Sequence, residues 1–147
     1  MDSFRGIFPH TLDSKGRVSV PNRFRDVLKD CPDPRLVVTH GSNGCLAVYP
    51  MPRWKEAEDD VARLPGGEEK DKYIRHFISP AQDCAMDKMN RMLIPAQMRE
   101  VAGLNREVLM VGALDKFEIW DKAKYETYMA ATRESALELR KIHEVRI

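Results

Sequence analysis

Residues 12–21 read Leu-Asp-Ser-Lys-Gly-Arg-Val-Ser-Val-Pro, and residues 86–95 read Met-Asp-Lys-Met-Asn-Arg-Met-Leu-Ile-Pro. Both segments follow the pattern apolar-Asp-x-x-(Gly or Asn)-Arg-x-x-apolar-Pro, and the second begins 74 residues after the first. A motif that recurs in this way indicates an internal repeat, and the remaining sequence divides around its two copies.

The two copies continue past each proline. Residues 22–28 and 96–102 both predict a short helix with apolar positions three apart, after a strand that the proline ends. Farther on, residues 45–49 and 116–120 both alternate apolar residues with others, which is typical of a half-buried strand. This second match has a spacing of 71, so the second copy is three residues shorter.

Longer helices are expected near residues 52–64, 68–78 and 122–143, and Pro65-Gly66-Gly67 separates the first two. The element order is therefore ββ-α-ββ-α, a linking helix, and the same order again. Units of about 70 residues are small for two separate cores. We therefore expect a β-rich α+β protein in which a pseudo-twofold pair of units shares one barrel-like core.

The segments Asp13–Gly16 and Asp87–Asn90 have the chemistry of a tight hairpin turn whose flanking residues supply the strands. The Asp accepts backbone N–H bonds within the turn, and Gly adopts the left-handed conformation without a Cβ penalty. Asn is the non-glycine residue best suited to that conformation. Arg17 and Arg91 follow directly, so each is predicted to stand at the mouth of a rigid turn. An Arg there can also simply pair with the Asp or face solvent, but two matched copies favour a function.

The net charge conceals an uneven distribution. The 147 residues hold 24 Lys and Arg against 23 Asp and Glu, a net charge of +1, which excludes binding to nucleic acid by bulk charge. Residues 1–25 have five cations against two anions, a net +3, and residues 86–99 have three against one, a net +2. Residues 55–72 have four cations against seven anions, a net −3. Two basic segments therefore flank an acidic connector.

Several other classes of protein find no support in the sequence. The three cysteines are scattered, without C-x-x-C, so reduced thiols in the cytoplasm are expected. No metal site is expected, because the four histidines lack H-x-x-x-H and H-E-x-x-H spacing. No signal peptide and no apolar run near the ~18 residues of a membrane span are found. Asn43-Gly44 predicts a hairpin turn rather than a phosphate loop, and Trp54 and Trp120 are expected to pack in a core or subunit interface. We expect no catalytic residue and no cofactor.

Further motifs accompany the repeated turn. They are Phe4-Arg5-Gly6, Leu46-Ala47-Val48-Tyr49-Pro50 with Trp54, Met86-Asp87, Val111-Gly112 and Lys116-Phe117-Glu118-Ile119-Trp120-Asp121. With these motifs the chain resembles, over almost its whole length, the MraZ family of bacterial transcriptional regulators. The resemblance implies two tandem SpoVT/AbrB-like swapped-hairpin (double-split β-barrel) units with flanking helices. The units would span residues 5–52 and 81–124, with a helical linker at 53–80 and a C-terminal helix at 125–147.

The resemblance also implies a partner and an assembly. It implies a homo-oligomeric ring, an octamer or larger, in the cytoplasm and associated with the nucleoid. The ring would bind double-stranded DNA at repeated promoter elements of the division and cell-wall gene cluster. In that family the Arg of the Asp-x-x-Gly-Arg element carries DNA binding. This role transfers to Arg17, and Arg91 occupies the equivalent place.

Roles for the basic residues follow from the chemistry of DNA. Arg17 and Arg91 are expected to reach base edges, because a guanidinium pairs with guanine O6 and N7. Lys15, Arg5 and Lys88 are expected to position phosphates.

Two other functions remain open at the level of sequence. The same basic hairpins could serve a non-catalytic protein–protein interaction module with an acidic partner, which would show no dependence on DNA repeats. An enzyme would need a convergent set of acid, base or metal ligands in a pocket.

Overall fold

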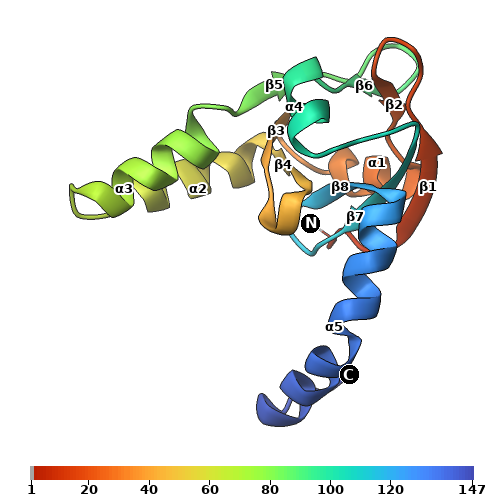
Figure 1. Ribbon diagram of the computed structural model, residues 1–147. Helices are drawn as coiled ribbons and strands as arrows, with labels where there is room; N and C mark the ends of the chain where they lie inside the picture. The colour runs from red at the N-terminus through yellow and green to blue at the C-terminus, as the bar shows by residue number, and fades with distance from the viewer. Residues whose placement is uncertain (1) are drawn as a thin grey trace.

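The strands form two antiparallel sheets in the computed structural model, which describes residues 2–147 (Figure 1). The larger sheet has six strands in the order β1-β7-β8-β4-β3-β5, and β2 pairs with β6 in the smaller one. The strands are β1 (Ile7–Thr11), β2 (Arg17–Ser19), β3 (Leu36–His40), β4 (Leu46–Pro50), β5 (Gln82–Cys84), β6 (Arg91–Leu93), β7 (Glu107–Gly112) and β8 (Phe117–Asp121). With its helices, the chain is the predicted β-rich α+β protein.

The two sequence copies exchange strands. By the repeat spacing β5 corresponds to β1, β6 to β2, and β7 to β3. Strand β1 of the first copy pairs with β7 of the second, and β5 of the second copy pairs with β3 of the first. The small sheet joins the copies as well, with Val18 opposite Met92. The predicted pseudo-twofold arrangement around one core is confirmed. One detail of the local interpretation is wrong: β1 and β2 flank the first turn as strands, but each pairs with the other copy instead of with its neighbour.

The core is shared between the copies. Phe24 stacks on Phe117 of the second copy at 4.8 Å between ring centroids, and the edges of Phe4 and Phe8 meet it at 5.5 and 5.3 Å. Phe24 lies on α1 (Asn22–Lys29), whose counterpart is α4 (Ala96–Val101). Both short helices begin directly after a proline, as predicted, because a proline fits the first turn but cannot continue a strand ladder.

The longer helices extend from this body as two arms (Figure 1). One arm comprises α2 (Met51–Ala62), α3 (Glu68–Tyr73) and the π-helical turn η2 (Ile74–Ile78), and the other is α5 (Lys122–Ile142). The helix expected at 68–78 therefore changes type after Tyr73. The Thr39 hydroxyl donates to the Phe77 carbonyl at 2.6 Å, which ties the π turn to β3.

The expectations for the two tryptophans and the Asn43 turn are confirmed. Trp54 and Trp120 are buried and each packs on a tyrosine, Trp54 on Tyr49 and Trp120 on Tyr125, with ring centroids 5.7 and 5.2 Å apart. The turn η1 (Ser42–Gly44) joins β3 to β4, with a φ of 61° at Asn43. None of the helices described between residues 2 and 147 has the length and apolar character needed to span a bilayer.

Candidate nucleic-acid interface

The first turn is built around the Asp13 carboxylate. Its Oδ1 accepts hydrogen bonds from the backbone N–H groups of Lys15 and Arg17, each at 2.9 Å. Its Oδ2 accepts from Arg17 Nε at 2.6 Å. Gly16 has a φ of 83°, a value that glycine adopts without strain. The carboxylate therefore closes the turn and fixes the adjacent guanidinium at the same time.

The second turn repeats this arrangement. Asp87 Oδ1 accepts from the backbone N–H groups of Met89 and Arg91 at 2.8 and 3.0 Å, and Asp87 Oδ2 accepts from Arg91 Nε at 3.0 Å. Asn90 has a φ of 60°, so it fills the place of the glycine as predicted. The two turns therefore hold their arginines in the same way.

The hydrogen bonds of the carboxylates lower their pKa values. For Asp13 the bond from the backbone N–H of Arg17 is the largest cause, helped by the Arg17 side chain and the N–H of Lys15, and the pKa falls to about 2. The pKa of Asp87 is lowered for the same reason, chiefly by the backbone N–H of Arg91. Both turns therefore carry ionised carboxylates at neutral pH.

Each turn also depends on the other copy. The backbone N–H of Ile94 donates to the Gly16 carbonyl at 3.0 Å, and the backbone N–H of Val20 donates to the Asn90 carbonyl at 2.9 Å. These bonds continue the β2–β6 ribbon into the turns.

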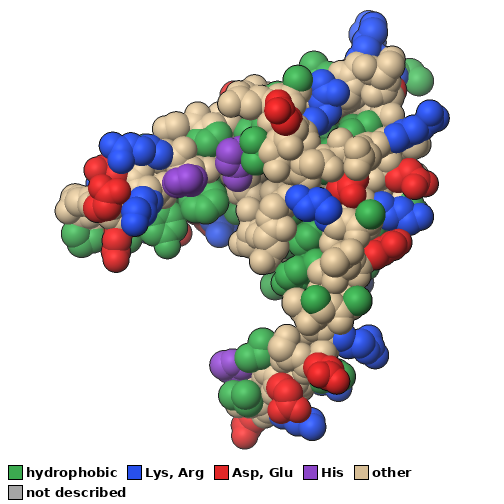
Figure 2. All heavy atoms as spheres, viewed as in Figure 1, with side chains coloured by type: hydrophobic (Ala, Val, Ile, Leu, Met, Phe, Trp, Pro, Cys, Tyr) green, Lys and Arg blue, Asp and Glu red, His purple; other side chains and the backbone are tan. Residues whose placement is uncertain are grey.

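The ribbon has one buried face and one outer face. Val18 and Met92 are buried, and because side chains alternate along a strand, Arg17 and Arg91 lie on the opposite, outer face. Arg91 Nη1 lies 4.0 Å from Asp13 Oδ2, so the two arginines are close. Figure 2 shows Lys and Arg side chains gathered at the end of the molecule that carries β2 and β6.

The other predicted site residues lie in different places. Lys15 and Lys88 are exposed within the two turns, beside the arginines. Arg5 is exposed before β1, where its backbone packs against Gly112. Strand β1 separates it from Asp13, so the structure does not bring Arg5 to the ribbon.

Two arginines that the sequence prediction omitted do lie at the ribbon. Arg99 Nε donates to the Ile94 carbonyl at 3.1 Å, and Arg25 Nε donates to the Val20 carbonyl at 3.2 Å. The Arg99 guanidinium also covers Gly16, because a Cβ built on that residue would lie 2.5 Å from Arg99 Cζ. The signal in the sequence is a second matched arginine in each copy, eight residues after the arginine of the turn.

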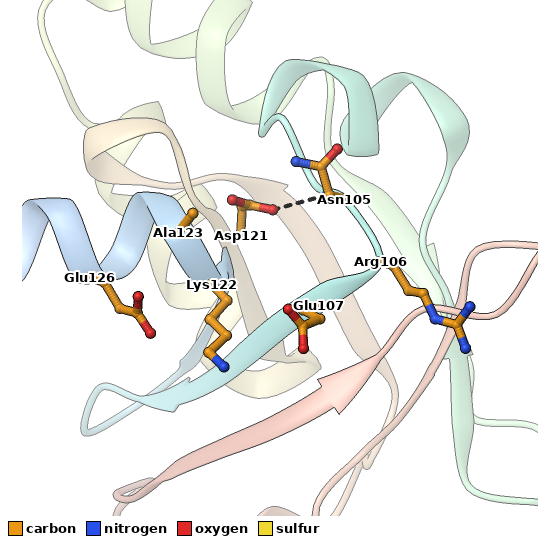
Figure 3. Close-up of a pocket in the computed structure, with 7 residues that line it drawn as sticks. All are labelled: Asn105, Arg106, Glu107, Asp121, Lys122, Ala123 and Glu126. Carbon is orange, nitrogen blue, oxygen red and sulfur yellow. Dashed lines mark hydrogen bonds between the residues drawn. The ribbon is translucent and has the colours of Figure 1, made fainter.

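A hollow at the start of α5 is separate from the ribbon (Figure 3). Asp121 caps α5 by accepting from the backbone N–H of Lys124 at 3.3 Å, and it also accepts from that of Asn105 at 3.0 Å. Arg106 lines the hollow, yet its guanidinium points away from Asp121 (Figure 3). Among residues 2–147, no group of three or more His, Cys, Asp or Glu side chains could hold a metal ion.

The fold and this face define a protein of two exchanged β-rich repeats that displays paired arginines on a rigid ribbon. Comparisons with known proteins place it in a family. A family model described as "MraZ protein, putative antitoxin-like" matches residues 3–74 and 77–143, two segments whose starts reproduce the repeat spacing.

Named relatives resemble the chain over most of its length. A protein of Lachnoclostridium phytofermentans called transcriptional regulator MraZ is 42% identical over 84% of this chain and 85% of its own. One of the same name from Pediococcus pentosaceus is 39% identical over 90% of both chains. Another from Acidithiobacillus ferrooxidans is 40% identical over 84% of this chain and 85% of its own. The chain therefore belongs to the MraZ family, a family of transcriptional regulators rather than enzymes. The expected family and the expectation of a non-enzyme are confirmed.

Proposed function

We propose that this protein regulates transcription by binding double-stranded DNA sequence-specifically through the arginine-bearing turns of its two repeats. The observation that carries the proposal is the pair Arg17 and Arg91, held alike on one face of the β2–β6 ribbon. Membership of the MraZ family supports the proposal, since the relatives are named transcriptional regulators.

The geometry suits reading of base edges. Each arginine uses Nε to hold its aspartate, and neither arginine uses Nη1 or Nη2 as a hydrogen-bond donor within residues 2–147, so these nitrogens are available to a base. A guanine presents O6 and N7 to such a pair in the major groove, and one good contact discriminates by ~1–3 kcal/mol. A two-stranded ribbon fits that groove, so both turns can approach one site together.

We further propose that the targets are repeated promoter elements of the division and cell-wall gene cluster. The two SpoVT/AbrB-like units of the proposal span residues 5–52 and 81–124. The protein acts in the cytoplasm, in association with the nucleoid. Few phosphates face one chain, so one chain alone binds weakly. Repeated subunits on repeated sites raise affinity by roughly 10²–10⁴ where the spacings match.

A homo-oligomeric ring, an octamer or larger, supplies those repeated subunits. Large apolar side chains are exposed on both arms, including Tyr73 (48%) beside η2 and Leu139 (52%) on α5. Exposed apolar surface of this kind marks contacts between proteins. Mass measurement tests the assembly: the parent should be a ring, and Leu139→Glu should lower its mass while leaving the circular dichroism spectrum of the fold unchanged. A parent of monomer mass would refute the ring.

The decisive experiment measures binding of the parent, Arg17→Gln and Arg91→Gln to a duplex from upstream of the protein's own gene. A shuffled duplex of the same composition measures specificity. Each variant should lose about 5- to 150-fold of the preference for the natural duplex, the equivalent of ~1–3 kcal/mol. Arg63→Gln is the control, because Arg63 is exposed on the acidic arm and pairs with Asp60.

Two outcomes would overturn the proposal. Unchanged preference in both arginine variants, with an unchanged oligomer, would remove the turns from DNA recognition. Absence of a footprint and of any dependence on repeat number would instead favour the protein–protein module with an acidic partner.

A further inference from the structure

The cations of the ribbon differ in how far acidic side chains neutralise them. Arg17 pairs with Asp13, and Arg91 pairs with Asp87. Arg99 and Arg106, by contrast, have no carboxylate oxygen within 4.0 Å anywhere in residues 2–147. The excess positive charge near the ribbon is therefore not on the arginines of the turns.

These two unpaired arginines line one groove beside the first turn. Its wall includes Leu12, Asp13 and Ser14 from the turn, together with Arg99, Glu100 and Arg106 from the second copy. The backbone N–H of Leu12 donates to the Arg106 carbonyl at 2.8 Å, which fixes Arg106 next to the turn. Since Asp13 is engaged by Arg17, the groove presents two free cations against one exposed acid, Glu100.

The second turn has one unpaired arginine beside it instead of two. Arg25, the counterpart of Arg99, also has no carboxylate oxygen within 4.0 Å among residues 2–147, so the two turns differ at the counterpart of Arg106. At the spacing of 71 that relates β3 to β7, Arg35 corresponds to Arg106, and Asp33 stands two residues before Arg35 as Leu104 stands two before Arg106. Asp33 binds Arg35 through two bonds, from Nε to Oδ1 at 2.9 Å and from Nη2 to Oδ2 at 2.7 Å. The carboxylate two positions earlier therefore neutralises Arg35, whereas Arg106 in the matching place of the other copy has no such partner.

We propose that Arg99 and Arg106 bind a phosphate of the DNA backbone beside the first turn, and that the pseudo-symmetric ribbon consequently takes one orientation on DNA. This inference rests on the proposed function. Phosphate contacts fix the register and orientation of a protein on a duplex, whereas base contacts specify the sequence. A phosphate held on one side of the ribbon gives an otherwise symmetric reader a direction.

The test compares Arg106→Gln with its counterpart Arg35→Gln. Arg106 is exposed and its side chain makes no hydrogen bond to the protein among residues 2–147, so its replacement should leave the fold intact. On the natural duplex, Arg106→Gln should weaken binding and reduce the slope of log K against log salt by about 0.9 for each phosphate that the variant no longer neutralises. Its preference for the natural over the shuffled duplex should stay within about twofold of the parent's. Arg35→Gln should match the parent in both measurements.

A second measurement locates the bound phosphate. Duplexes carrying a single neutral methylphosphonate, moved stepwise along one repeat, should weaken the parent most at a position to one side of the bases read by the turns. At that position the substitution should weaken Arg106→Gln less than it weakens the parent, because only Arg99 then remains to hold the phosphate. Arg99→Lys should keep the salt slope, while Arg99→Gln should lower it.

Three results would overturn the inference: an unchanged slope in Arg106→Gln, an equal loss in Arg35→Gln, or a methylphosphonate profile symmetric about the repeat. Failure of the proposed function is distinct, because either the parent would then not prefer the natural duplex, or Arg17→Gln and Arg91→Gln would both keep the parent's preference.

Discussion

Gly16→Ala should destabilise the protein more than Asn90→Ala, although the two residues hold equivalent places in the repeat. Both have positive φ, 83° for Gly16 and 60° for Asn90. Gly16 is buried under Arg99, whereas Asn90 is exposed. A Cβ at Gly16 would lie 2.5 Å from Arg99 Cζ, so the guanidinium has to move.

The magnitude follows from three contributions. An L residue in the left-handed region costs roughly 1–2 kcal/mol. Displacing Arg99 weakens its hydrogen bond to the Ile94 carbonyl, and such charged bonds contribute about 1.5–3 kcal/mol. Alanine lowers the conformational entropy of the unfolded chain relative to glycine, which offsets ~0.4–1 kcal/mol of this loss of stability. We expect a net loss of about 2–3 kcal/mol for Gly16→Ala and about 1 kcal/mol for Asn90→Ala, where only the backbone preference changes.

Thermal unfolding at a fixed protein concentration measures the difference. At ~2–4 °C per kcal/mol for a domain of this size, Gly16→Ala should lower Tm by about 4–12 °C and Asn90→Ala by about 2–4 °C. The concentration is held constant because assembly shifts the apparent Tm. Equal losses, or a larger loss in Asn90→Ala, would refute the role assigned to the packing of Arg99 on Gly16.

Three further predictions concern the core, the turn and the thiols. Phe24→Ala should lower the free energy of unfolding by about 3–5 kcal/mol, because Phe24 packs against both copies. The variant should still unfold in one transition by circular dichroism and by tryptophan fluorescence, and two separate transitions would contradict a shared core. The pKa of Asp13 is about 2, below the ordinary 3.8, so the ionised carboxylate stabilises the fold above pH ~4, and this stabilisation is lost as the pH falls through about 2. Between pH 4 and 2 the Tm of Asp13→Asn should therefore fall less than the Tm of the parent. An equal fall in Tm would count against the turn network. Burial raises the pKa values of Cys45 and Cys84 to about 12 and 11. Both thiols should therefore resist a thiol reagent at pH 8 until urea unfolds the chain. Rapid labelling of the folded protein would contradict their burial.

Local elements were predictable because their causes are local. The Asp-x-x-Gly turn, its Asn variant, and the helices after Pro21 and Pro95 all follow from backbone preferences of a few adjacent residues. Strand pairing was not predictable in this way. Strands β1 and β2 satisfy the pattern of a simple hairpin, and only the shared apolar core, with Val18 facing Met92, favours exchange between the copies.

The part of the candidate site that lies within the repeated motif was predictable from the sequence, and the part that depends on tertiary structure was not. Arg17 and Arg91 belong to the repeated motif, so the sequence alone brings them to attention. Arg5 is near the turn along the chain, but an extended strand advances about 3.3 Å per residue and carries the two apart. Arg99 reaches Gly16 only because the copies exchange strands, so its position depends on tertiary structure that spacing does not encode.

The ion pairs of the two turns explain how a chain with a net charge of only +1 can recognise DNA. Pairing with Asp13 removes much of the long-range attraction that Arg17 would exert on a phosphate backbone. It also holds the guanidinium in place beforehand, which reduces the side-chain entropy that binding to a base would otherwise cost. Recognition then depends more on where the guanidinium groups are held than on the net charge of the chain. Because each turn is bonded to the other copy at Gly16 and Asn90, a displacement of one turn disturbs both. The exchanged strands thus favour accurate placement of two arginines, and the residues flanking the turns, such as Arg106, are left to supply attraction and direction.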